Sequence, residues 1–475
     1  MQHGPGTENA YGGVAQAYAE SVPVLVLPQG YGRRTAFVPD NYSATISMRT
    51  IAKHVEPILL AAETPNILRR AFTQLRNGRL RPVIVEMPYD VLAEQVDDGF
   101  AYEAVVRTRS APDAAAVKAA ARTLVDAKRL VIHAGQGVHW ANAYAELRAL
   151  AELLAAPVST SLEGKSAFDE THDLALGSGG AAIPRTVRHF LDAADVILGI
   201  GCSFSDTAFG VAMPKGKTVI HATLDPADLN KNVVCAQALV GDAQLTLAML
   251  IEECRALLPA PRDSAPIARE IKDIEAGWLA EWLPLLESND APLSPYRVLW
   301  ELQRTVEVAD TIITHDAGSP RDQLTPFWKS TAPLSYIGWG KSTQLGYGLG
   351  LAMGAKLACP DKLCINVWGD AAIGFTGMDF ETAVRERLPI LSILLNNSAM
   401  AIELDVMPVA TARYRSTDIS GDYAAFARAL GGYGERVERP DDIAAAIRRG
   451  IAATRAGQPA LLEFITAKEK RASRL

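Results

Sequence analysis

Two polar side chains suited to a magnesium site follow two apolar segments of this sequence. Asp370 comes directly after the apolar run 363–368, and Asn397 follows the run 390–395. Both runs have the composition of strands that are buried on both faces of a parallel sheet. A hard divalent cation takes carboxylate, amide, carbonyl and phosphate oxygens as ligands. If the two strands are neighbours, we expect Asp370, Asn397 and the carbonyl of Ala399 to bind Mg²⁺.

Each of these residues also has a simpler interpretation. Asp370 could cap the helix expected around 376–383, and Asn397 could be a turn former. Their shared position at strand ends, with Gly369 directly before the acid, favours the metal site over two unrelated local roles.

A further loop has the composition of a phosphate contact. Gly318 and Ser319 follow the strand expected over 310–315, and a helix pattern comes after them. Backbone N–H groups at the start of a helix favour an anion. His315, at the end of that strand, is a candidate to face the same site, with a structural role as the alternative.

The elements that must position these residues come in three blocks. In each block short apolar strands alternate with helical patterns, which predicts an α/β protein with three doubly wound parallel-sheet domains. The blocks cover residues 1–95, 112–258 and 295–475, and residues 259–294 form a linker with one helix. In such sheets ligands bind outside the carboxyl ends of the strands.

Composition excludes several classes of function. The chain has 475 residues, 49 % of them hydrophobic and 21 % charged, and a formal net charge of −7, which argues against a nucleic-acid partner. No apolar run of about 18 residues is present to span a membrane. The start of the sequence lacks the features of a signal peptide, so we expect a cytoplasmic protein. Five cysteines without Cys-x-x-Cys spacing indicate buried free thiols.

Segments from all three blocks resemble thiamine diphosphate-dependent enzymes of the acetolactate synthase and 2-hydroxyacyl-CoA lyase type. Residues 3–27 are similar to their pyrimidine-binding domain, and residues 133–168 to the start of their central domain. The stretch 369–382 is closest to 2-hydroxyacyl-CoA lyases and oxalyl-CoA decarboxylases. Gly369-Asp370 followed by Asn396-Asn397 matches the family's diphosphate and Mg²⁺ signature, with Ala371 where glycine is usual.

The resemblance implies a role for each residue of the site. Asp370, Asn397 and the Ala399 carbonyl would hold Mg²⁺, and Leu345 would lie beneath the cofactor and enforce its bent shape, with core packing as the alternative. Glu403 would move protons as a catalytic residue, with an exposed helix position as its alternative. The other cofactor contacts would come from Gly318, Ser319, Gly369, Ala371, Ala372 and Met400, with Met400 and Ile402 also facing the substrate.

The implied function is a thiamine diphosphate- and Mg²⁺-dependent C–C lyase or carboligase that acts on a 2-oxo acid or a 2-hydroxyacyl-CoA. A homodimer or homotetramer is expected, because such enzymes form their sites between subunits. FAD or ADP in the central domain is not expected, since Gly135-Gln136-Gly137 alone is a weak motif. A nicotinamide dehydrogenase would need a complete strand–GxGxxG–helix unit, which is absent.

The first domain is expected to be incomplete. In the family an activating glutamate precedes the Gly-Pro-Gly segment, which here is Gly4-Pro5-Gly6. A mis-assigned start and a separate polypeptide that completes the domain are two explanations. The alternative function is a truncated or split cofactor-binding subunit without catalysis, which needs a partner chain for the glutamate.

Overall fold

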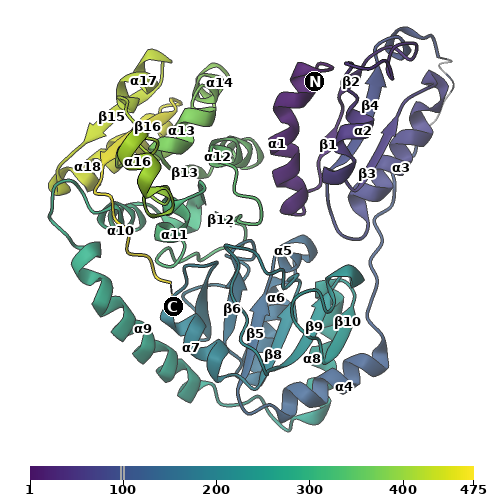
Figure 1. Ribbon diagram of the computed structural model, residues 1–475. Helices are drawn as coiled ribbons and strands as arrows, with labels where there is room; N and C mark the ends of the chain where they lie inside the picture. The colour runs from purple at the N-terminus through teal and green to yellow at the C-terminus, as the bar shows by residue number, and fades with distance from the viewer. Residues whose placement is uncertain (97–98, 100–101, 475) are drawn as a thin grey trace. The chain divides into compact units, whose positions relative to one another are not determined.

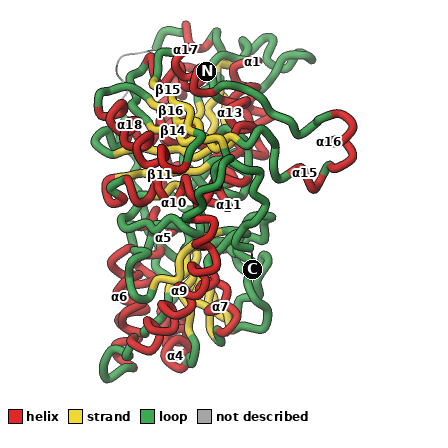
Figure 2. Tube along the Cα trace, turned by 90° about the vertical axis from the view of Figure 1, so that its left-hand side faces the viewer, coloured by secondary structure: helices red, strands yellow, loops and turns green. Residues whose placement is uncertain are grey.

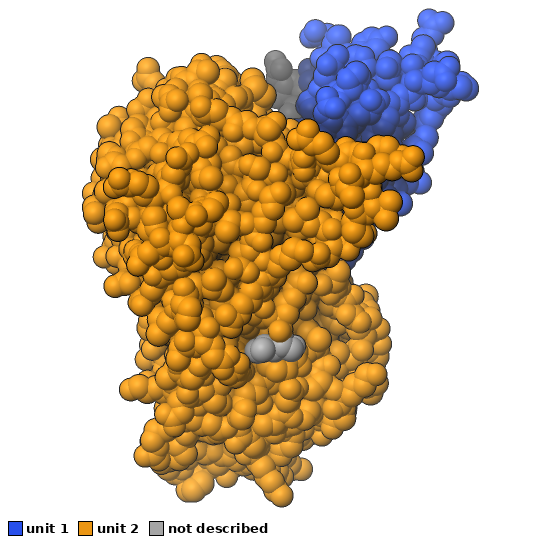
Figure 3. Space-filling view, turned by 60° about the vertical axis from the view of Figure 1, so that its left-hand side comes forward, with its two compact units in different colours: residues 1–111 blue, residues 112–475 orange. Residues whose placement is uncertain are grey.

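The computed structural model describes residues 1–96, 99 and 102–474 (Figure 1). They form two compact units, residues 1–111 and 112–475, which are coloured separately in Figure 3. Four positions of the stretch between the expected first and second blocks, and the last residue of the block 295–475, lie outside the described residues. No helix within the described ranges is long and apolar enough to cross a membrane.

The first unit is built around one central strand, β4, which pairs in parallel with three shorter strands. The strands are β1 (Leu25–Val26), β2 (Gln29–Gly30), β3 (His54–Pro57) and β4 (Val83–Pro88). The helices are α1 (Pro5–Ala19), α2 (Ala44–Ser47) and α3 (Thr64–Arg76). Apolar residues from β4 and α3 form a core that includes Ile67, Ala71, Val83 and Val85.

One strand of this unit differs from the sequence expectation. The apolar run 22–28 suggests one continuous strand, but the structure has the two short strands β1 and β2 with Pro28 between them. Proline has no backbone N–H to donate to a sheet. Its carbonyl still accepts a hydrogen bond of 2.8 Å from the N–H of Met87.

The second unit contains two six-stranded parallel sheets. The first has the strand order β10-β9-β8-β5-β6-β7. Its strands are β5 (Leu130–Ala134), β6 (Val158–Ser161), β7 (Ala175–Gly179), β8 (Val196–Ile200), β9 (Thr218–Thr223) and β10 (Gln237–Val240). Its helices are α4 (Ala114–Asp126), α5 (Gly137–Ala141), α6 (Tyr144–Leu154), α7 (Arg185–Ala193) and α8 (Ala243–Leu257).

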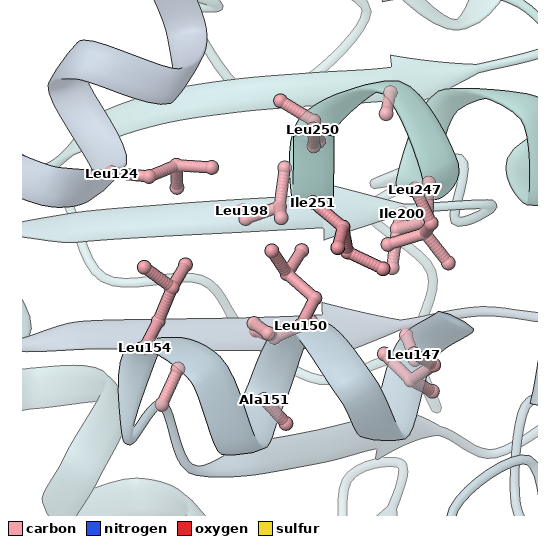
Figure 4. Close-up of a cluster of buried hydrophobic side chains, with 14 of the residues drawn as sticks. Leu124, Leu147, Leu150, Ala151, Leu154, Leu198, Ile200, Leu247, Leu250 and Ile251 are labelled. Carbon is pink, nitrogen blue, oxygen red and sulfur yellow. The ribbon is translucent and has the colours of Figure 1, made fainter. Parts of the chain in front are cut away.

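Leucines of the helices make the core on one face of this sheet. Leu124 of α4, Leu150 of α6 and Leu250 of α8 gather around Leu198 of β8 (Figure 4). All four side chains are fully buried. The helices thus place their apolar stripes on a sheet whose strands are themselves apolar, as in a doubly wound domain.

A long helix, α9 (Ala265–Leu286), leads to the second sheet. Trp278 and Trp282 of α9 are buried against Phe327, and the rings of Trp278 and Phe327 stack at 4.9 Å between centroids. This aromatic cluster attaches the helix to the elements that follow it in the chain.

The second sheet has the order β12-β11-β13-β14-β16-β15. Its strands are β11 (Thr311–His315), β12 (Tyr336–Ile337), β13 (Leu363–Gly369), β14 (Leu391–Asn396), β15 (Tyr433–Val437) and β16 (Ala460–Ile465). Its helices are α10 (Pro295–Thr305), α11 (Ser319–Leu324), α12 (Tyr347–Ala358), α13 (Asp370–Thr376), α14 (Asp379–Arg385), α15 (Glu403–Val406), α16 (Pro408–Tyr414), α17 (Tyr423–Ala429) and α18 (Ile443–Arg455).

The connections of this sheet change direction between β11 and β13. From β11 the chain moves outward to β12, whereas from β13 it moves to β14 on the opposite side. Loops that leave neighbouring strands in opposite directions open a crevice at the carboxyl end of the sheet. The residues that follow β11, β13 and β14 therefore meet at one edge.

A buried carboxylate, held by an ion pair, links the two sheets of the second unit. Lys165 and Glu170 follow β6, and the Lys165 Nζ lies 2.7 and 2.6 Å from the two carboxylate oxygens of Glu170. Glu170 also accepts a hydrogen bond from the N–H of Ser330, at 2.7 Å, and donates its own N–H to the Ser330 carbonyl, at 2.9 Å. We call these three residues the seam, because Ser330 belongs to the segment between α11 and β12.

Replacing Lys165 with methionine should destabilise the second unit strongly. Lys165 is 1 % exposed, and its loss leaves the Glu170 carboxylate buried without a counter-charge. Removing one partner of a buried pair costs about 3–5 kcal/mol. Urea denaturation measures this change in the free energy of unfolding. Lys118→Met, at an exposed lysine 3.9 Å from Glu253, is the control and should shift stability by less than about 0.5 kcal/mol. Equal effects of the two substitutions would contradict a structural role for the seam.

Candidate functional site

A cleft lies at the carboxyl edge of the second sheet, where the connections change direction. It encloses about 850 Å³ of atom-free space, part of it open to solvent. Of the residues that the sequence suggested for the site, the cleft brings together all except His315: Gly318, Ser319, Leu345, Gly369, Asp370, Ala371, Ala372, Asn397, Ala399, Met400, Ile402 and Glu403. Residues from four separate loops thus share one surface.

Asp370 and Asn397 converge on a single backbone N–H group. The N–H of Ala399 donates to Oδ2 of Asp370 at 3.1 Å and to Oδ1 of Asn397 at 3.0 Å. The parallel pairing of β13 with β14, in which Gly369 faces Leu395, puts the two residues side by side. Oxygens brought this close together by one donor can serve as ligands of one small cation. The Ala399 carbonyl remains a prediction as the third ligand, since the observed contacts involve its N–H.

The Asp370 carboxylate is 2 % exposed. Burial raises the pKa of Asp370 to about 6, and the hydrogen bonds that it accepts from the N–H groups of Ala399 and Ala371 oppose this rise. A divalent cation beside it would stabilise the ionised form. Among the described residues no group of three or more His, Cys, Asp and Glu side chains could hold a metal ion. A cation in this cleft would therefore depend on mixed carboxylate, amide and carbonyl oxygens.

A second buried carboxylate shapes the wall of the cleft that carries Leu345. Asp316 follows β11 and is fully buried. One of its oxygens accepts from the N–H groups of Ala317, at 2.8 Å, and Gly346, at 2.9 Å, and the other accepts from Gly348, at 2.9 Å. Asp316 thereby fixes the turn before α12, so Leu345 is held at the cleft by an acid 29 positions earlier in the chain.

The loop after β11 turns sharply at Gly318. Its φ of 88° lies in the left-handed region, where a glycine is favoured. The helix that follows, α11, has six residues, and α13 after Asp370 has seven. Helices this short contribute little macrodipole, so anion binding at this edge would rest on individual N–H groups and side chains.

His315 does not face the cleft. Its ring is fully buried and stacks on Trp339, with 5.2 Å between centroids. Burial and the nearby Arg321 charge lower the pKa of His315 to about 3, so the ring is neutral. The possibility that His315 faces the site is therefore not supported, and its position is structural.

The third wall of the cleft comes from the loop after β14. Met400, Ile402 and Glu403 line the cleft, and the Glu403 side chain is half-buried. Beyond Glu403 the short helices α15 and α16 stand out from the rest of the second unit (Figure 2). They carry exposed apolar side chains, including Val406 and Val409, which are 73 % and 74 % exposed.

The glycines of the first sheet are explained by packing. The N–H of Gly137 donates to the carbonyl of Gly201 at 2.8 Å. A Cβ atom on Gly135 would come within 2.5 Å of the backbone of Gly201 and Cys202. The Gly135-Gln136-Gly137 motif thus lets two loops approach closely, which gives its glycines a packing role.

Two stretches of the second unit match family models. Residues 117–250 match the model described as thiamine pyrophosphate enzyme, central domain. Residues 316–464 match the model described as thiamine pyrophosphate enzyme, C-terminal TPP binding domain. The second match covers the strands and loops that build the cleft.

The whole chain is also similar to curated proteins. A probable acetolactate synthase large subunit of Methanocaldococcus jannaschii is 30 % identical over 490 residues, which cover 97 % of this chain and 80 % of that protein. The chain belongs to the thiamine pyrophosphate enzyme family. Two other relatives are the acetolactate synthase isozyme 3 large subunit of Escherichia coli, 28 % identical over 93 % of this chain and 78 % of that protein, and an acetolactate synthase of Mycobacterium bovis, 28 % identical over 97 % and 76 %.

This thiamine pyrophosphate enzyme has site residues that its sequence did not indicate. One of them, Asp316, is buried and orders the turn before α12. Three others, Arg321, Thr466 and Phe209, line the cleft. Thr466 directly follows β16, and this strand-end position is a signal that could have indicated it. Arg321 has the sequence context of an ordinary surface helix, so no local signal indicates it.

The stability of this thiamine pyrophosphate enzyme should depend on the titration of Asp316. Burial raises the pKa of Asp316 to about 6 from its usual 3.8. Between these values the folded chain binds more protons than the unfolded chain, so the stability contributed by Asp316 falls as pH rises. The difference in the free energy of unfolding between the native chain and Asp316→Asn should grow by roughly 2 kcal/mol in favour of the native chain from about pH 7 to about pH 4.5. Urea titrations at both pH values measure it. A constant difference would mean that the three N–H donors offset the effect of burial.

Proposed function

We propose that this enzyme forms or cleaves a C–C bond of a 2-oxo acid with thiamine diphosphate and Mg²⁺, as an acetolactate synthase-like carboligase. The observation that carries the proposal is the convergence of Asp370 and Asn397 on the N–H of Ala399 inside the cleft. The names of the relatives support a 2-oxo acid over a 2-hydroxyacyl-CoA as the substrate, since the three relatives named above are described as acetolactate synthases.

The residues of the cleft fit the cofactor and its metal. The carboxylate of Asp370 and the amide oxygen of Asn397 supply hard oxygen ligands of the kind that Mg²⁺ prefers. Ala371 and Ala372 have small side chains beside them, which lets a diphosphate approach the backbone. Leu345 would support the organic part of the cofactor, because the Asp316 turn holds it at the cleft wall.

The protein's own groups position the reactants and move protons. The chemistry that thiamine diphosphate supplies when bound is addition to a substrate carbonyl and storage of the electron pair released by C–C cleavage. Glu403 lines the same cleft and is half-buried, so its carboxyl group would give or take a proton at the reacting carbon. Met400 and Ile402 provide apolar surface that excludes water from this reaction.

An oligomer is also part of the proposal. The M. jannaschii and E. coli relatives are named as large subunits, which supports assembly with further chains. The exposed apolar side chains of α15 and α16 would be suited to such a contact. Sedimentation analysis of the purified chain, alone and with cofactor, tests this part separately.

Asp370→Ala should remove cofactor binding that depends on the metal. Loss of a residue that only supports a metal ligand lowers metal affinity about 10- to 100-fold. Loss of a direct ligand should lower the affinity for the cofactor by at least this factor. Calorimetric titration of thiamine diphosphate with Mg²⁺, and again with EDTA, measures it. Asp379→Ala, at an exposed acid that begins α14, is the control and should leave the affinity unchanged. Metal-independent binding of the cofactor by the native chain would refute the proposed ligand set.

Consumption of pyruvate by the native chain with both cofactors is the direct test of activity. Turnover supports the carboligase. Binding of the cofactor without turnover would instead support a cofactor-binding subunit that requires a partner chain, and absence of binding would exclude both functions.

Glu403→Gln should lower kcat without changing cofactor affinity. A positioned general acid or base contributes about 10²- to 10⁴-fold to the rate. Steady-state kinetics with pyruvate and calorimetry with thiamine diphosphate separate the two effects. The matched control is Asp405→Asn, two positions along the same short helix, where the side chain is 72 % exposed. A glutamine variant with native kcat would assign Glu403 to a non-catalytic position.

A further inference from the structure

Arg321 is a buried cation that does not use all of its hydrogen-bond donors. It belongs to α11 and lines the cleft, yet it is only 2 % exposed. Its Nε donates to Oδ1 of Asp322 at 2.8 Å. Among the described residues neither Nη1 nor Nη2 has a hydrogen-bond partner. Buried charged groups are normally fully paired, so two unused donors in a cleft call for an anionic partner.

The guanidinium group is held in a fixed plane. Its Cζ lies 3.8 Å from the centre of the Phe209 ring, so the two planar groups stack. Phe209 comes from the loop between β8 and β9, and Asp322 fixes the opposite edge of the guanidinium. The free edge therefore presents Nη1 and Nη2 as a rigid pair of parallel donors, the geometry that two coplanar oxygens accept.

The local charge suits a ligand with a single negative charge. Asp322 is shared by two cations, since Arg474 also donates to its carboxylate at 2.8 Å. One carboxylate between two guanidinium groups leaves one positive charge uncompensated within this trio. A second unused donor lines the same cleft: within the described ranges the buried hydroxyl of Thr466 has no hydrogen-bond partner.

We propose that Arg321 binds the carboxylate of the 2-oxo acid substrate through Nη1 and Nη2. This inference rests on the proposed function, because it assigns the substrate end of the same cleft. In the proposed site, Asp370 and Asn397 bind the Mg²⁺ ion that holds the cofactor's diphosphate. Nη1 and Nη2 of Arg321 are therefore available to bind a second anion. A carboxylate is planar and carries one charge, whereas a phosphate group is tetrahedral and carries more.

The test uses the complete chain and a probe that does not react. Oxamate has the shape and the carboxylate of pyruvate, and calorimetry measures its affinity with and without thiamine diphosphate and Mg²⁺. Arg321→Gln should weaken oxamate binding about 10- to 100-fold, the range expected for a charge-assisted pair of hydrogen bonds. Arg321→Lys should recover only part of it, because an ammonium group keeps the charge and loses the fork. Arg455→Gln, at an exposed arginine that ends α18, is the matched control and should bind oxamate as the native chain does.

Cofactor affinity, steady-state kinetics and phosphate binding identify the source of the anion. Thiamine diphosphate affinity should stay within about threefold of the native value in Arg321→Gln, while the KM for pyruvate rises and the kcat/KM for the uncharged methyl pyruvate does not change. A loss of thiamine diphosphate affinity with unchanged oxamate binding would assign Arg321 to the cofactor and overturn the proposal. Tighter binding of inorganic phosphate than of oxamate by the native chain would overturn it as well.

A purely structural role for Arg321 gives a different pattern. The glutamine and lysine variants would then change the midpoint of thermal unfolding but would bind oxamate like the native chain, which would refute the inference. Because oxamate binding is measured without turnover, it decides the role of Arg321 even if the chain proves inactive. Failure of the proposed function would instead appear as absent thiamine diphosphate binding in the native chain.

Discussion

The buried carboxylate of Asp316 orders the cleft on which the other features depend. Its two oxygens accept hydrogen bonds from the backbone N–H groups of Ala317, Gly346 and Gly348. They therefore connect the loop after β11 to the turn before α12 and to the start of that helix. A carboxyl group suits this position, because its two oxygens have enough lone pairs to accept from three N–H groups at once. Leu345 and Gly318 have defined positions because they belong to the segments that Asp316 connects.

The part of the site that could be predicted from sequence is the part encoded by local pattern. Asp370 and Asn397 each follow an apolar strand, and parallel pairing of those strands is enough to bring them together. Leu345 was suggested only by family resemblance, since its position depends on Asp316, far away in the sequence. The alternation of strands and helices in three blocks likewise predicted the parallel sheets. The half-exposed strand β3 could not be predicted in the same way, because short polar strands carry little periodicity.

Arg321 shows why the remainder could not be predicted. Its neighbours in the sequence, Pro320, Asp322 and Gln323, give the polar pattern of a solvent-exposed helix. In the structure all of them are buried, and Phe209 from the other sheet stacks on the Arg321 guanidinium. This stack joins positions more than 100 residues apart, and the local pattern of the sequence does not predict it. The same holds for Thr466, whose hydroxyl becomes notable only once its surroundings are known.

The seam at Lys165, Glu170 and Ser330 has a consequence for how this enzyme could change during evolution. Phe209 and Arg321 belong to segments of the two different sheets. The geometry of their stack therefore depends on the contacts that hold the two sheets together, such as the one between Glu170 and Ser330. Lys165, Glu170 and Ser330 do not line the cleft, yet a substitution there alters one of the contacts that hold its two walls together. Selection for a new substrate could therefore act through positions in the interior between the sheets, and variants with altered preference would map to the seam as well as to the cleft.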